Sequence, residues 1–277
     1  MKTSTQLKAH IRNLSKKSNV EAEILLRSFM LERFLERVVM SDYKHDFILK
    51  GGMLIAAMVG IDTRTTMDMD ATIKGMSLTE SEVTFIISSI LSVQIDDGVG
   101  FSLRSIEEIR EEADYPGYRV SIQAIFDKTR QTLKVDITTG DFVTPGEIEY
   151  SFKLMFEDRT ISIMAYNLET VLAEKFESIV TRGVTNTRMR DFYDIYILTT
   201  THPFNTDTFK SALHNTVEKR GVADQMADAA DAIFMVDKSP VMIDLWNKYS
   251  KKYSYAADVT WEAAMEAVKA LATLMDS

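Results

Sequence analysis

Two aspartates on alternate positions, Asp68 and Asp70, follow a glycine pair, Gly51 and Gly52, in the stretch GGMLIAAMVGIDTRTTMDMD. On a β-strand, alternate side chains point to the same face, so the two carboxylates would lie side by side and repel each other. A divalent cation relieves such repulsion, and hard oxygen ligands suit Mg²⁺ or Mn²⁺. The acidic pair alone is weak evidence for a metal site, because alternating acids also occur on solvated strand faces.

A third acid, Asp136, lies in the later stretch QTLKVDITT, where apolar and polar residues alternate. This period of two predicts a strand with Asp136 on the face opposite the apolar side chains. If that strand neighbours the one that carries Asp68 and Asp70, the three carboxylates form a cluster able to hold two ions. Such a cluster supports nucleotidyl or phosphoryl transfer by neutralising charge.

The glycine pair follows the apolar FILK and precedes the apolar MLIAAMVG, which predicts a strand, a tight turn and a helix start. Glycines there expose backbone N–H groups, and a helix N-terminus favours anions, so the turn could hold a triphosphate. The turn is not a P-loop, because the G-x-x-x-x-G-K-[ST] spacing is absent. Arg64 and Thr66 could add donors to phosphate, although Arg64 can also be interpreted as a plain loop residue.

Two cations interrupt the apolar stripe of the predicted helix LETVLAEKFESIVTR. Lys175 falls inside the stripe, and Arg182 lies two turns further along it. A cation in such a place must reach water or meet an anion, and a lone lysine more often reaches water. Two cations in register favour an edge that faces an anion, and nucleotide phosphates are a natural partner.

The next stretch, RMRDFYDIY, carries Asp191 and Asp194 three residues apart. Asp191 is explained equally well by the preference of acids for a helix N-terminus. Asp194 stands among aromatic and aliphatic residues. Three interpretations stay open for it: pairing with Arg190, pairing with Lys175, or orienting a reacting group.

The elements that would position these residues follow from the periodicity of the chain. Helix-start signals of the capping-box type occur at Ser18 with Glu21 and at Thr79 with Glu82. From about Phe101 the period is two, and after Asn167 it is helical, with helices expected at 168–182, 190–199 and 206–220. We therefore expect an α+β protein: a mixed sheet with flanking helices over residues 1–165, followed by an α-helical domain over residues 166–277.

The 277-residue chain has a net charge of −9 and no cysteine. The charge disfavours a general DNA-coating role, and the lack of thiols excludes disulfides and thiolate metal sites. No apolar run approaches the length of a membrane span, so we expect a cytoplasmic protein without a membrane partner. Two local patches are basic despite the negative net charge of the chain, and they could bind a nucleic-acid phosphate backbone. Two solvated helix faces explain these patches equally well. The patches consist of Lys2, Lys8, Arg12, Lys16 and Lys17, and of Lys248, Lys251 and Lys252 interleaved with Tyr249, Tyr253 and Tyr255.

The chain resembles the AbiEii/AbiGii toxin family, which is related to the MenT-type toxins. Three stretches carry the resemblance: LKGGMLIAAMVGIDTRTTMDMD, LKVDI and LAEKFESIVTRGVTNTRMRDFYDIYIL. The resemblance covers roughly residues 45 to 200 and rests on several motifs in the same order. Four features of the family match residues of this sequence. The glycine turn matches Gly51 and Gly52, and the R-x-[ST]-x-D-x-D motif matches Arg64, Thr66, Asp68 and Asp70. The later lysine matches Lys175, and the R-[DK]-x-x-D element matches Arg190, Asp191 and Asp194. Thr66 stands where serine is usual and keeps the hydroxyl, whereas Met53 stands where a small residue usually follows the glycines. Asp136 rests on spacing alone.

The resemblance implies a DNA polymerase β-like nucleotidyltransferase domain followed by a helical domain, in the toxin of an abortive-infection toxin–antitoxin system used in phage defence. We expect Mg²⁺-dependent transfer of NMP from an NTP to RNA, with the tRNA 3′ end favoured, which inhibits translation and growth. An AbiEi-like antitoxin is the expected functional partner, and direct binding stays open. The glycine turn, Arg64 and Lys175 would hold the triphosphate, and Asp136 could help deprotonate the RNA 3′-hydroxyl.

Two other classes of function remain open. A metal-dependent nuclease or phosphohydrolase would use the same carboxylates. A non-catalytic GTP- or NTP-binding module is the third class, and the paired Asp68 and Asp70 argue against it, because a degenerate site has little reason to keep them.

Overall fold

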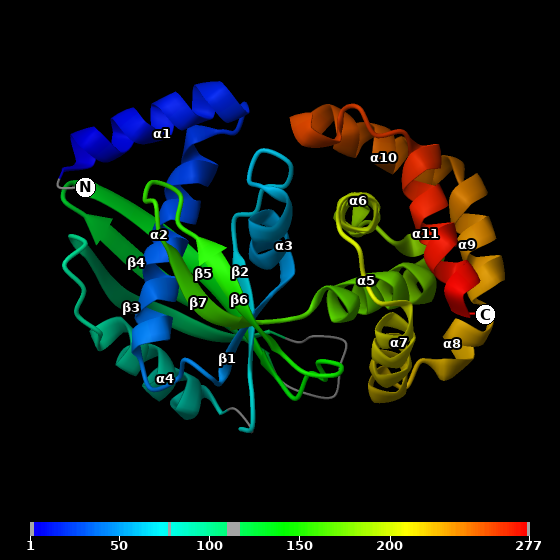
Figure 1. The fold of residues 1–277 in the computed structure, drawn as a ribbon, viewed down its shortest axis with the longest axis horizontal. Coiled ribbons are helices and arrows are strands. Elements are labelled where there is room, and N and C mark those ends of the chain that lie inside the picture. The colour runs from blue at the N-terminus through cyan, green and yellow to red at the C-terminus, as the bar shows by residue number, and fades with distance from the viewer. Residues whose placement is uncertain (1–2, 77–78, 110–116, 276–277) are drawn as a thin grey trace. The chain divides into compact units, whose positions relative to one another are not determined.

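The computed structural model describes residues 3–76, 79–109 and 117–275, and the chain divides into two compact units (Figure 1). The first unit holds Met1–Asp141 and Glu147–Tyr166, and the second holds Phe142–Gly146 and Asn167–Ser277. The first unit combines a sheet with helices, and the second is built from helices, so the expected α+β class is confirmed. None of the described helices has the length and apolar content needed to cross a membrane.

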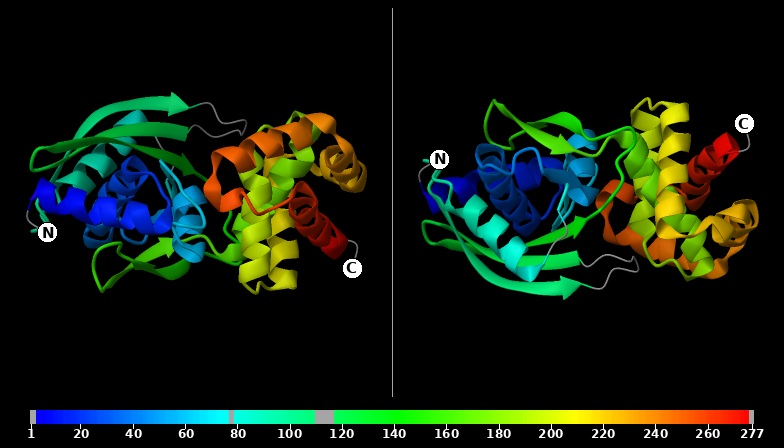
Figure 2. Two further views of the ribbon diagram at one scale, coloured as in Figure 1. Left: turned by 90° about the horizontal axis from the view of Figure 1, so that it is seen from above. Right: turned by 90° about the horizontal axis from the view of Figure 1, so that it is seen from below.

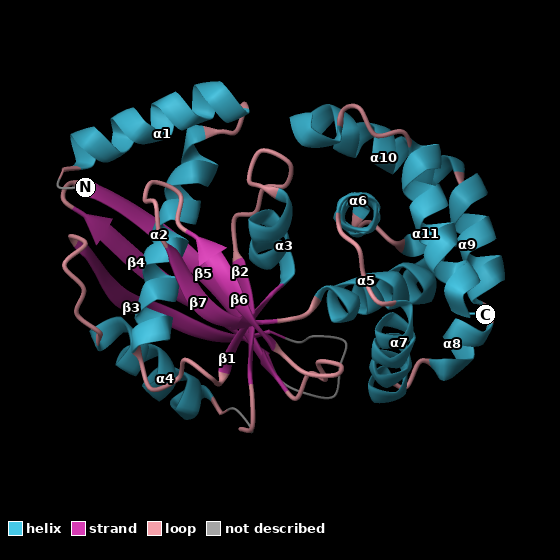
Figure 3. Cartoon of the chain, viewed as in Figure 1, coloured by secondary structure: helices cyan, strands magenta, loops and turns pink. Residues whose placement is uncertain are grey.

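One sheet forms the centre of the first unit (Figure 3). Its described strands are β1 Phe47–Lys50, β2 Met69–Ile73, β3 Val99–Ile109, β4 Gly117–Phe126, β5 Thr129–Thr139, β6 Ile148–Lys153 and β7 Thr160–Ala165. They follow the order β3-β4-β5-β2-β1-β7-β6, and the β2–β5 and β1–β7 pairs are parallel while the others are antiparallel. The predicted alternation is present, because Val120, Ile122, Leu133 and Val135 are fully buried.

The described helices of the first unit are α1 Ser4–Ser18, α2 Ala22–Met40, α3 Gly51–Val59 and α4 Glu80–Ser92. Helix α2 contacts both β5 and β7, and Figure 2 shows it on the concave side of the curved sheet. Helix α3 contacts β1 and β2, the two strands that it connects. The glycine pair at the start of α3 is therefore fixed against the two central strands.

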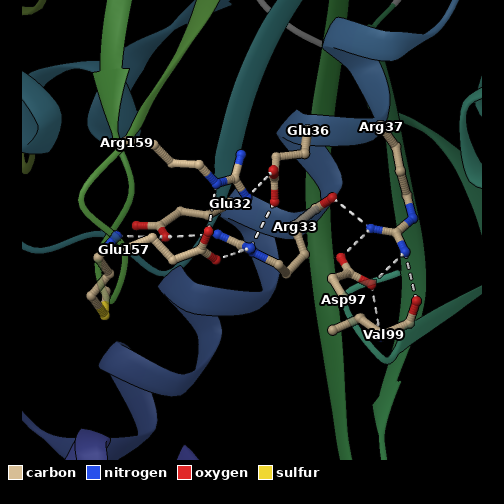
Figure 4. Close-up of polar contacts among 9 residues, drawn as sticks. Glu32, Arg33, Glu36, Arg37, Asp97, Val99, Glu157 and Arg159 are labelled. Atoms are coloured by element: carbon tan, nitrogen blue, oxygen red, sulfur yellow. Dashed lines mark hydrogen bonds and ion pairs between the residues drawn. The ribbon is translucent and has the colours of Figure 1, made fainter. Parts of the chain in front are cut away.

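Helix α2 carries a buried group of charged side chains, shown in Figure 4. Arg33 Nη1 lies 2.8 Å from Glu36 Oε2 and 2.6 Å from Glu157 Oε1. Glu32 Oε2 accepts a hydrogen bond of 3.0 Å from the backbone N–H of Met155. These contacts tie the turn between β6 and β7 to α2. Burial raises the pKa of the Glu32 carboxyl to about 8, although the Met155 hydrogen bond and Arg33 oppose the shift.

The two predicted capping boxes have different outcomes. Thr79 Oγ1 accepts from the N–H of Glu82 at 3.3 Å, and the Glu82 carboxylate accepts from the N–H of Thr79 at 2.7 Å, so this box is confirmed. The box at Ser18 is wrong, because Ser18 is the last residue of α1 and α2 begins after Glu21 without a side-chain cap. Asn19 ends α1 in the left-handed conformation, with φ 55°, and the N-cap of α2 is Glu21, three residues later than the predicted Ser18.

The second unit begins with three helices that carry the later motifs: α5 Leu168–Arg182, α6 Met189–Thr201 and α7 Thr206–Arg220. The predictions of 168–182 and 206–220 match these bounds, and α6 extends beyond 190–199 at both ends. Helix α5 contacts both α6 and α7. The remaining described helices are α8 Ala223–Ala227, α9 Ala229–Lys238, α10 Pro240–Lys252 and α11 Trp261–Met275, with short 3₁₀ segments η1 Gly183–Thr185 and η2 Ser254–Ala256.

Candidate active site

Four charged side chains form one row across four neighbouring strands of the first unit. Lys50 of β1 is paired in register with Asp70 of β2, and Asp70 is paired with Asp136 of β5. Asp136 is paired in turn with Arg119 of β4. Directly paired residues project to the same face of a sheet. The order along the row is therefore cation, carboxylate, carboxylate, cation. The strands of Asp70 and Asp136 are neighbours, as the expected carboxylate cluster required.

The glycine turn packs directly against Asp70. Gly51 has φ 66°, a conformation that glycine adopts without strain, and a Cβ built there would lie 2.1 Å from Asp70 Oδ2. The N–H of Gly52 donates a hydrogen bond to the Asp70 carboxylate. That carboxylate therefore lies at the N-terminus of α3, where the helix dipole favours negative charge. Position 51 must be glycine for both the backbone and the close approach.

The loop before the aspartates packs against Gly52. A Cβ at Gly52 would lie 2.7 Å from Thr66 Oγ1 and 3.1 Å from Arg64 Nη1. The Arg64 side chain is buried, and its guanidinium donates to the carbonyl of Thr65. The Thr66 hydroxyl donates to the carbonyl of Asp68 at 3.1 Å. Arg64 and Thr66 thus shape the turn, and contact of either side chain with phosphate stays a prediction.

The two carboxylates of the row and the nearby Asp68 affect one another electrostatically. Asp68 lies just before β2 and is partly buried, and Met69 between the two aspartates is fully buried. Burial raises the pKa of Asp70, Asp136 and Asp68 raise it further, and Lys50 opposes the shift. Ionised Asp70 is therefore unfavourable without a counter-charge, and a cation between the carboxylates would relieve this cost.

Arg119 binds both oxygens of Asp136. Arg119 Nε donates to Oδ1 at 2.8 Å, and Nη2 donates to Oδ2 at 2.6 Å. The hydrogen bonds to Asp136 and its charge raise the pKa of the guanidinium above its ordinary value. Sequence reasoning missed Arg119, although the alternation in YRVSIQAIF places it opposite the buried Val120 and so on the polar face of its strand.

A second ion pair lies at the other end of the row. Lys50 Nζ lies 2.6 Å from Asp141 Oδ2 and 5.8 Å from the centre of the Tyr166 ring. Burial raises the pKa of Asp141, but Lys50 and hydrogen bonds from Thr138 and Tyr166 outweigh burial and lower the pKa below its ordinary value. Sequence reasoning missed this pair as well. The position of Lys50 directly before the glycine turn is the signal that could have indicated it.

The donors at Asp68 and Asp70 fit a hard divalent cation, because both offer carboxylate oxygens beside a turn that leaves no room for a side chain. Within the described ranges, no group of three or more His, Cys, Asp or Glu side chains is placed to hold a metal ion. The carboxylate of Asp136 faces Arg119 instead. Asp136 as a third metal ligand therefore stays a prediction.

A separate charged cluster lies inside the helical unit. Lys175 Nζ of α5 lies 2.7 Å from Asp191 Oδ1 and 2.8 Å from Asp194 Oδ2, both on α6. The Asp194 side chain is fully buried, and that of Lys175 is 14% exposed. Of the interpretations open for Asp194, pairing with Lys175 is confirmed. Asp191 also lies in the first turn of α6, where the helix dipole favours an acid. Contact of this cluster with a nucleotide stays a prediction.

The two arginines near this cluster have partners in the same unit. Arg182 Nε donates to Ser178 Oγ on its own helix at 3.2 Å. Arg190 Nη2 donates to the Tyr253 hydroxyl at 3.2 Å, and its guanidinium carbon lies 5.3 Å from the centre of the Tyr253 ring. Residues of the R-D-x-x-D element therefore reach two different partners: its acids hold Lys175, and its arginine stacks on a tyrosine.

Comparisons with known proteins agree with this arrangement. The family described as nucleotidyl transferase AbiEii toxin of type IV toxin–antitoxin systems matches residues 33–267. A protein from H. pylori described as a "putative nucleotidyltransferase" shares 17% identity at a TM-score of 0.54, over 93% of this chain and 96% of that chain. JHP933 from Helicobacter pylori shares 16% identity at a TM-score of 0.54, over 93% of this chain and 94% of that chain. No curated protein matches the chain.

At such identities the solved structures show a shared fold, whereas the family match identifies the chain. The matched residues include the glycine turn, the predicted site aspartates Asp68, Asp70 and Asp136, and the Lys175 cluster. The chain therefore belongs to the AbiEii toxin family of type IV toxin–antitoxin systems and is a nucleotidyltransferase.

Proposed function

We propose that this nucleotidyltransferase moves the NMP group of an NTP onto the 3′-hydroxyl of an RNA, in a Mg²⁺- or Mn²⁺-dependent reaction, and that the RNA is tRNA. The observation that carries the proposal is the registered row of Lys50, Asp70, Asp136 and Arg119 with the glycine turn packed on Asp70. Phosphoryl-type transfer asks little covalent chemistry of the protein, because positioning and charge neutralisation supply most of the rate. A row of charges beside an anion-binding turn provides both.

In this proposal Asp68 and Asp70 hold the divalent ion, which would neutralise charge on the triphosphate. The turn at Gly51 and Gly52 binds phosphate oxygens at the N-terminus of α3, beside the Asp70 carboxylate that accepts from the N–H of Gly52. Arg64 keeps this turn in place from its buried position. The chain itself thus holds the triphosphate in position, and the glycines of the turn leave space for it because they carry no side chains.

We assign phosphate binding also to Lys175, whose ammonium Asp191 and Asp194 hold in one position. Arg182, two turns further along the same helix, is assigned the same role. Under this assignment residues 1–165 act as the nucleotidyltransferase domain and residues 166–277 as a helical domain that contributes to substrate binding.

RNA would be attracted by the two basic patches. Helix α1 exposes a line of basic side chains, and α10 exposes another close to a group of stacked tyrosines. Tyr253 and Tyr255 lie with ring centres 5.4 Å apart at 28°, and Lys252 lies 5.3 Å from the centre of the Tyr253 ring. Aromatic faces beside cations suit unpaired bases. The exposed basic residues of these patches are Lys8, Arg12, Lys16, Lys17, Lys248, Lys251 and Lys252, and Lys2 lies outside the described residues.

The test is to incubate the protein with total tRNA, Mg²⁺ and each α-labelled NTP in turn. We expect label in tRNA with at least one NTP, and loss of that label in Asp68→Asn. The matched control is Asp62→Asn, because Asp62 is an exposed aspartate in the preceding loop. The absence of label with every NTP would overturn the transferase proposal, and shortened tRNA would favour the nuclease.

In a cell, tRNA modified at its 3′ end could no longer be aminoacylated, and translation would therefore be blocked. Expression of the wild-type chain in the cytoplasm should arrest growth, and an AbiEi-like antitoxin should relieve the arrest. Growth arrest by Asp68→Asn would dissociate toxicity from the transferase site. Loss of phage resistance on deletion of the toxin–antitoxin pair would place the system in abortive infection.

A further inference from the structure

Asp136 is the carboxylate on which a second metal ion would depend, and Arg119 already occupies it. Both Asp136 oxygens accept hydrogen bonds from the guanidinium, at 2.8 and 2.6 Å. Such two-point pairing is the strongest geometry available to a carboxylate and an arginine. The pair is also built into the sheet, because the two residues are directly registered neighbours on β4 and β5.

The charges of the row, taken together with those of Asp68 and Asp141 beside it, leave room for one divalent ion. Two cations, Arg119 and Lys50, face the carboxylates of the site. Those carboxylates are Asp68, Asp70, Asp136 and Asp141, so two net negative charges remain when all four are ionised. One divalent cation at Asp68 and Asp70 neutralises this remainder. A second ion would have to displace a guanidinium that holds two charge-assisted hydrogen bonds.

We propose that Arg119 stands in for a second metal ion, so that the site holds one divalent cation at Asp68 and Asp70 and Asp136 serves to anchor the guanidinium. This inference rests on the proposed function, and it assigns Asp136 a role other than that of metal ligand. The Arg119 side chain is 39% exposed, so its unbonded guanidinium nitrogen can face a bound phosphate while the other two hold Asp136. Arg119 thereby supplies fixed positive charge that needs no ion from solution.

The number of bound metal ions tests the inference without any assay of activity. Mn²⁺ alone is titrated into the full chain, and free Mn²⁺ is counted by electron paramagnetic resonance. We expect one Mn²⁺ per wild-type chain and none in Asp68→Asn. Arg119→Met removes the stand-in charge and should admit a second Mn²⁺, because three carboxylates then face the site without their guanidinium. Arg119→Lys keeps the charge and should stay at one.

Two further variants separate this effect from a general change of charge. Arg104→Met removes an exposed arginine from the neighbouring strand β3, where Arg104 Nη2 donates to Gln123 Oε1 at 3.1 Å, and should leave the count at one. The double variant Arg119→Met with Asp136→Asn removes both members of the pair and should return the count to one. A circular-dichroism melt of each variant checks that it is folded.

Three results would overturn the inference. The first is two Mn²⁺ per wild-type chain, with a fall to one in Asp136→Asn. The second is a folded Arg119→Met chain that binds one Mn²⁺ with an affinity within about twofold of wild type. The third is a wild-type chain that binds no Mn²⁺. RNA labelling separates the two proposals: one bound Mn²⁺ without labelling overturns the proposed function alone, and labelling by a chain with two bound Mn²⁺ overturns this inference alone.

Discussion

Asp70 approaches Gly51 so closely that a Cβ on this glycine would lie 2.1 Å from Oδ2 of the carboxylate. Gly51 also has a positive φ of 66°. A side chain at position 51 is therefore excluded twice, by the backbone conformation and by the acid that the turn surrounds. The glycine turn and the first aspartate strand form one unit of structure, and the position of Asp70 depends on the absence of a Cβ.

The variant Gly51→Ala should therefore displace Asp70 and reduce RNA labelling on the order of 100-fold, because misplacing a reacting group by about 1 Å has effects of that size. The matched control is Gly75→Ala, where φ is 78° but, among the described residues beyond its chain neighbours, no atom lies within 4 Å of the added Cβ. The control bears only the backbone strain, about 1 kcal/mol, and should keep its labelling. Equal losses of labelling in the two variants would show that strain, and not contact with Asp70, matters at position 51.

The variant Asp70→Asn should be inactive and yet more stable than wild type. Asp70 is paired in register with Asp136 and is repelled by that carboxylate and by Asp68, so loss of one negative charge relieves the folded state. Thermal melting without added metal is expected to show a higher midpoint for the variant, and RNA labelling is expected to vanish. A lower midpoint would contradict the view that the carboxylates strain one another.

Lys175 links two acids of the helical unit, so its loss should affect stability as well as activity. The variant Lys175→Met removes the cation that pairs with the fully buried Asp194, which should cost about 3–5 kcal/mol in the free energy of unfolding. The double variant Lys175→Met with Asp194→Leu should recover most of that stability, because an apolar pair replaces the charges. Its labelling should stay low if the ammonium binds phosphate. Urea unfolding gives the stability, and Lys251→Met, which removes an exposed lysine of α10, is the control for stability alone, because Lys251 belongs to a proposed RNA-binding patch.

Glu32 predicts a pH dependence of stability. Its carboxyl has a pKa of about 8 in the folded chain against 4.5 in the unfolded chain. Between these values the folded chain binds more protons than the unfolded chain, so the free energy of unfolding falls as the pH rises from 4.5 towards 8. Glu32→Gln removes this dependence, and we expect the variant to be more stable than wild type by about 2–4 kcal/mol at pH 8, with convergence near pH 5.

Urea unfolding at pH 5, 6, 7 and 8 measures this difference for Glu32→Gln. The control is Glu23→Gln, on the same helix, because the Glu23 side chain is 64% exposed and pairs only at the surface with Arg27. Parallel stability curves for wild type and Glu32→Gln would contradict the assignment of a proton to buried Glu32.

Local patterns were sufficient for much of the fold. The alternation in YRVSIQAIF and QTLKVDITT predicted β4 and β5 with the correct faces, because burial of alternate residues is a property of each strand by itself. The predictions of where helices begin were less reliable. Thr79 and Glu82 form their capping box, but Ser18 does not, because Asn19 ends α1 in a left-handed conformation that a capping motif cannot reveal.

The candidate site was predictable where its members lie close together in the sequence or repeat a family motif. Gly51, Gly52, Asp68 and Asp70 belong to one short stretch, and the structure places the turn against the acid. Arg119 and Lys50 were missed, because each looks like an ordinary polar residue on its own strand. Only the pairing of strands shows that these cations lie at the two ends of the carboxylate row.

The sequence by itself determined most of the elements, the acidic strand, the glycine turn and the membership of a nucleotidyltransferase toxin family. The order of the strands and their register were decided by the tertiary structure, which brings Asp70 beside Asp136 across 66 residues of chain. Register depends on packing of the whole sheet and not on any one strand, and a slip of one residue would turn Asp136 towards the core. Tertiary packing therefore decided which cation neutralises which carboxylate, and with it the charge that remains for a metal ion.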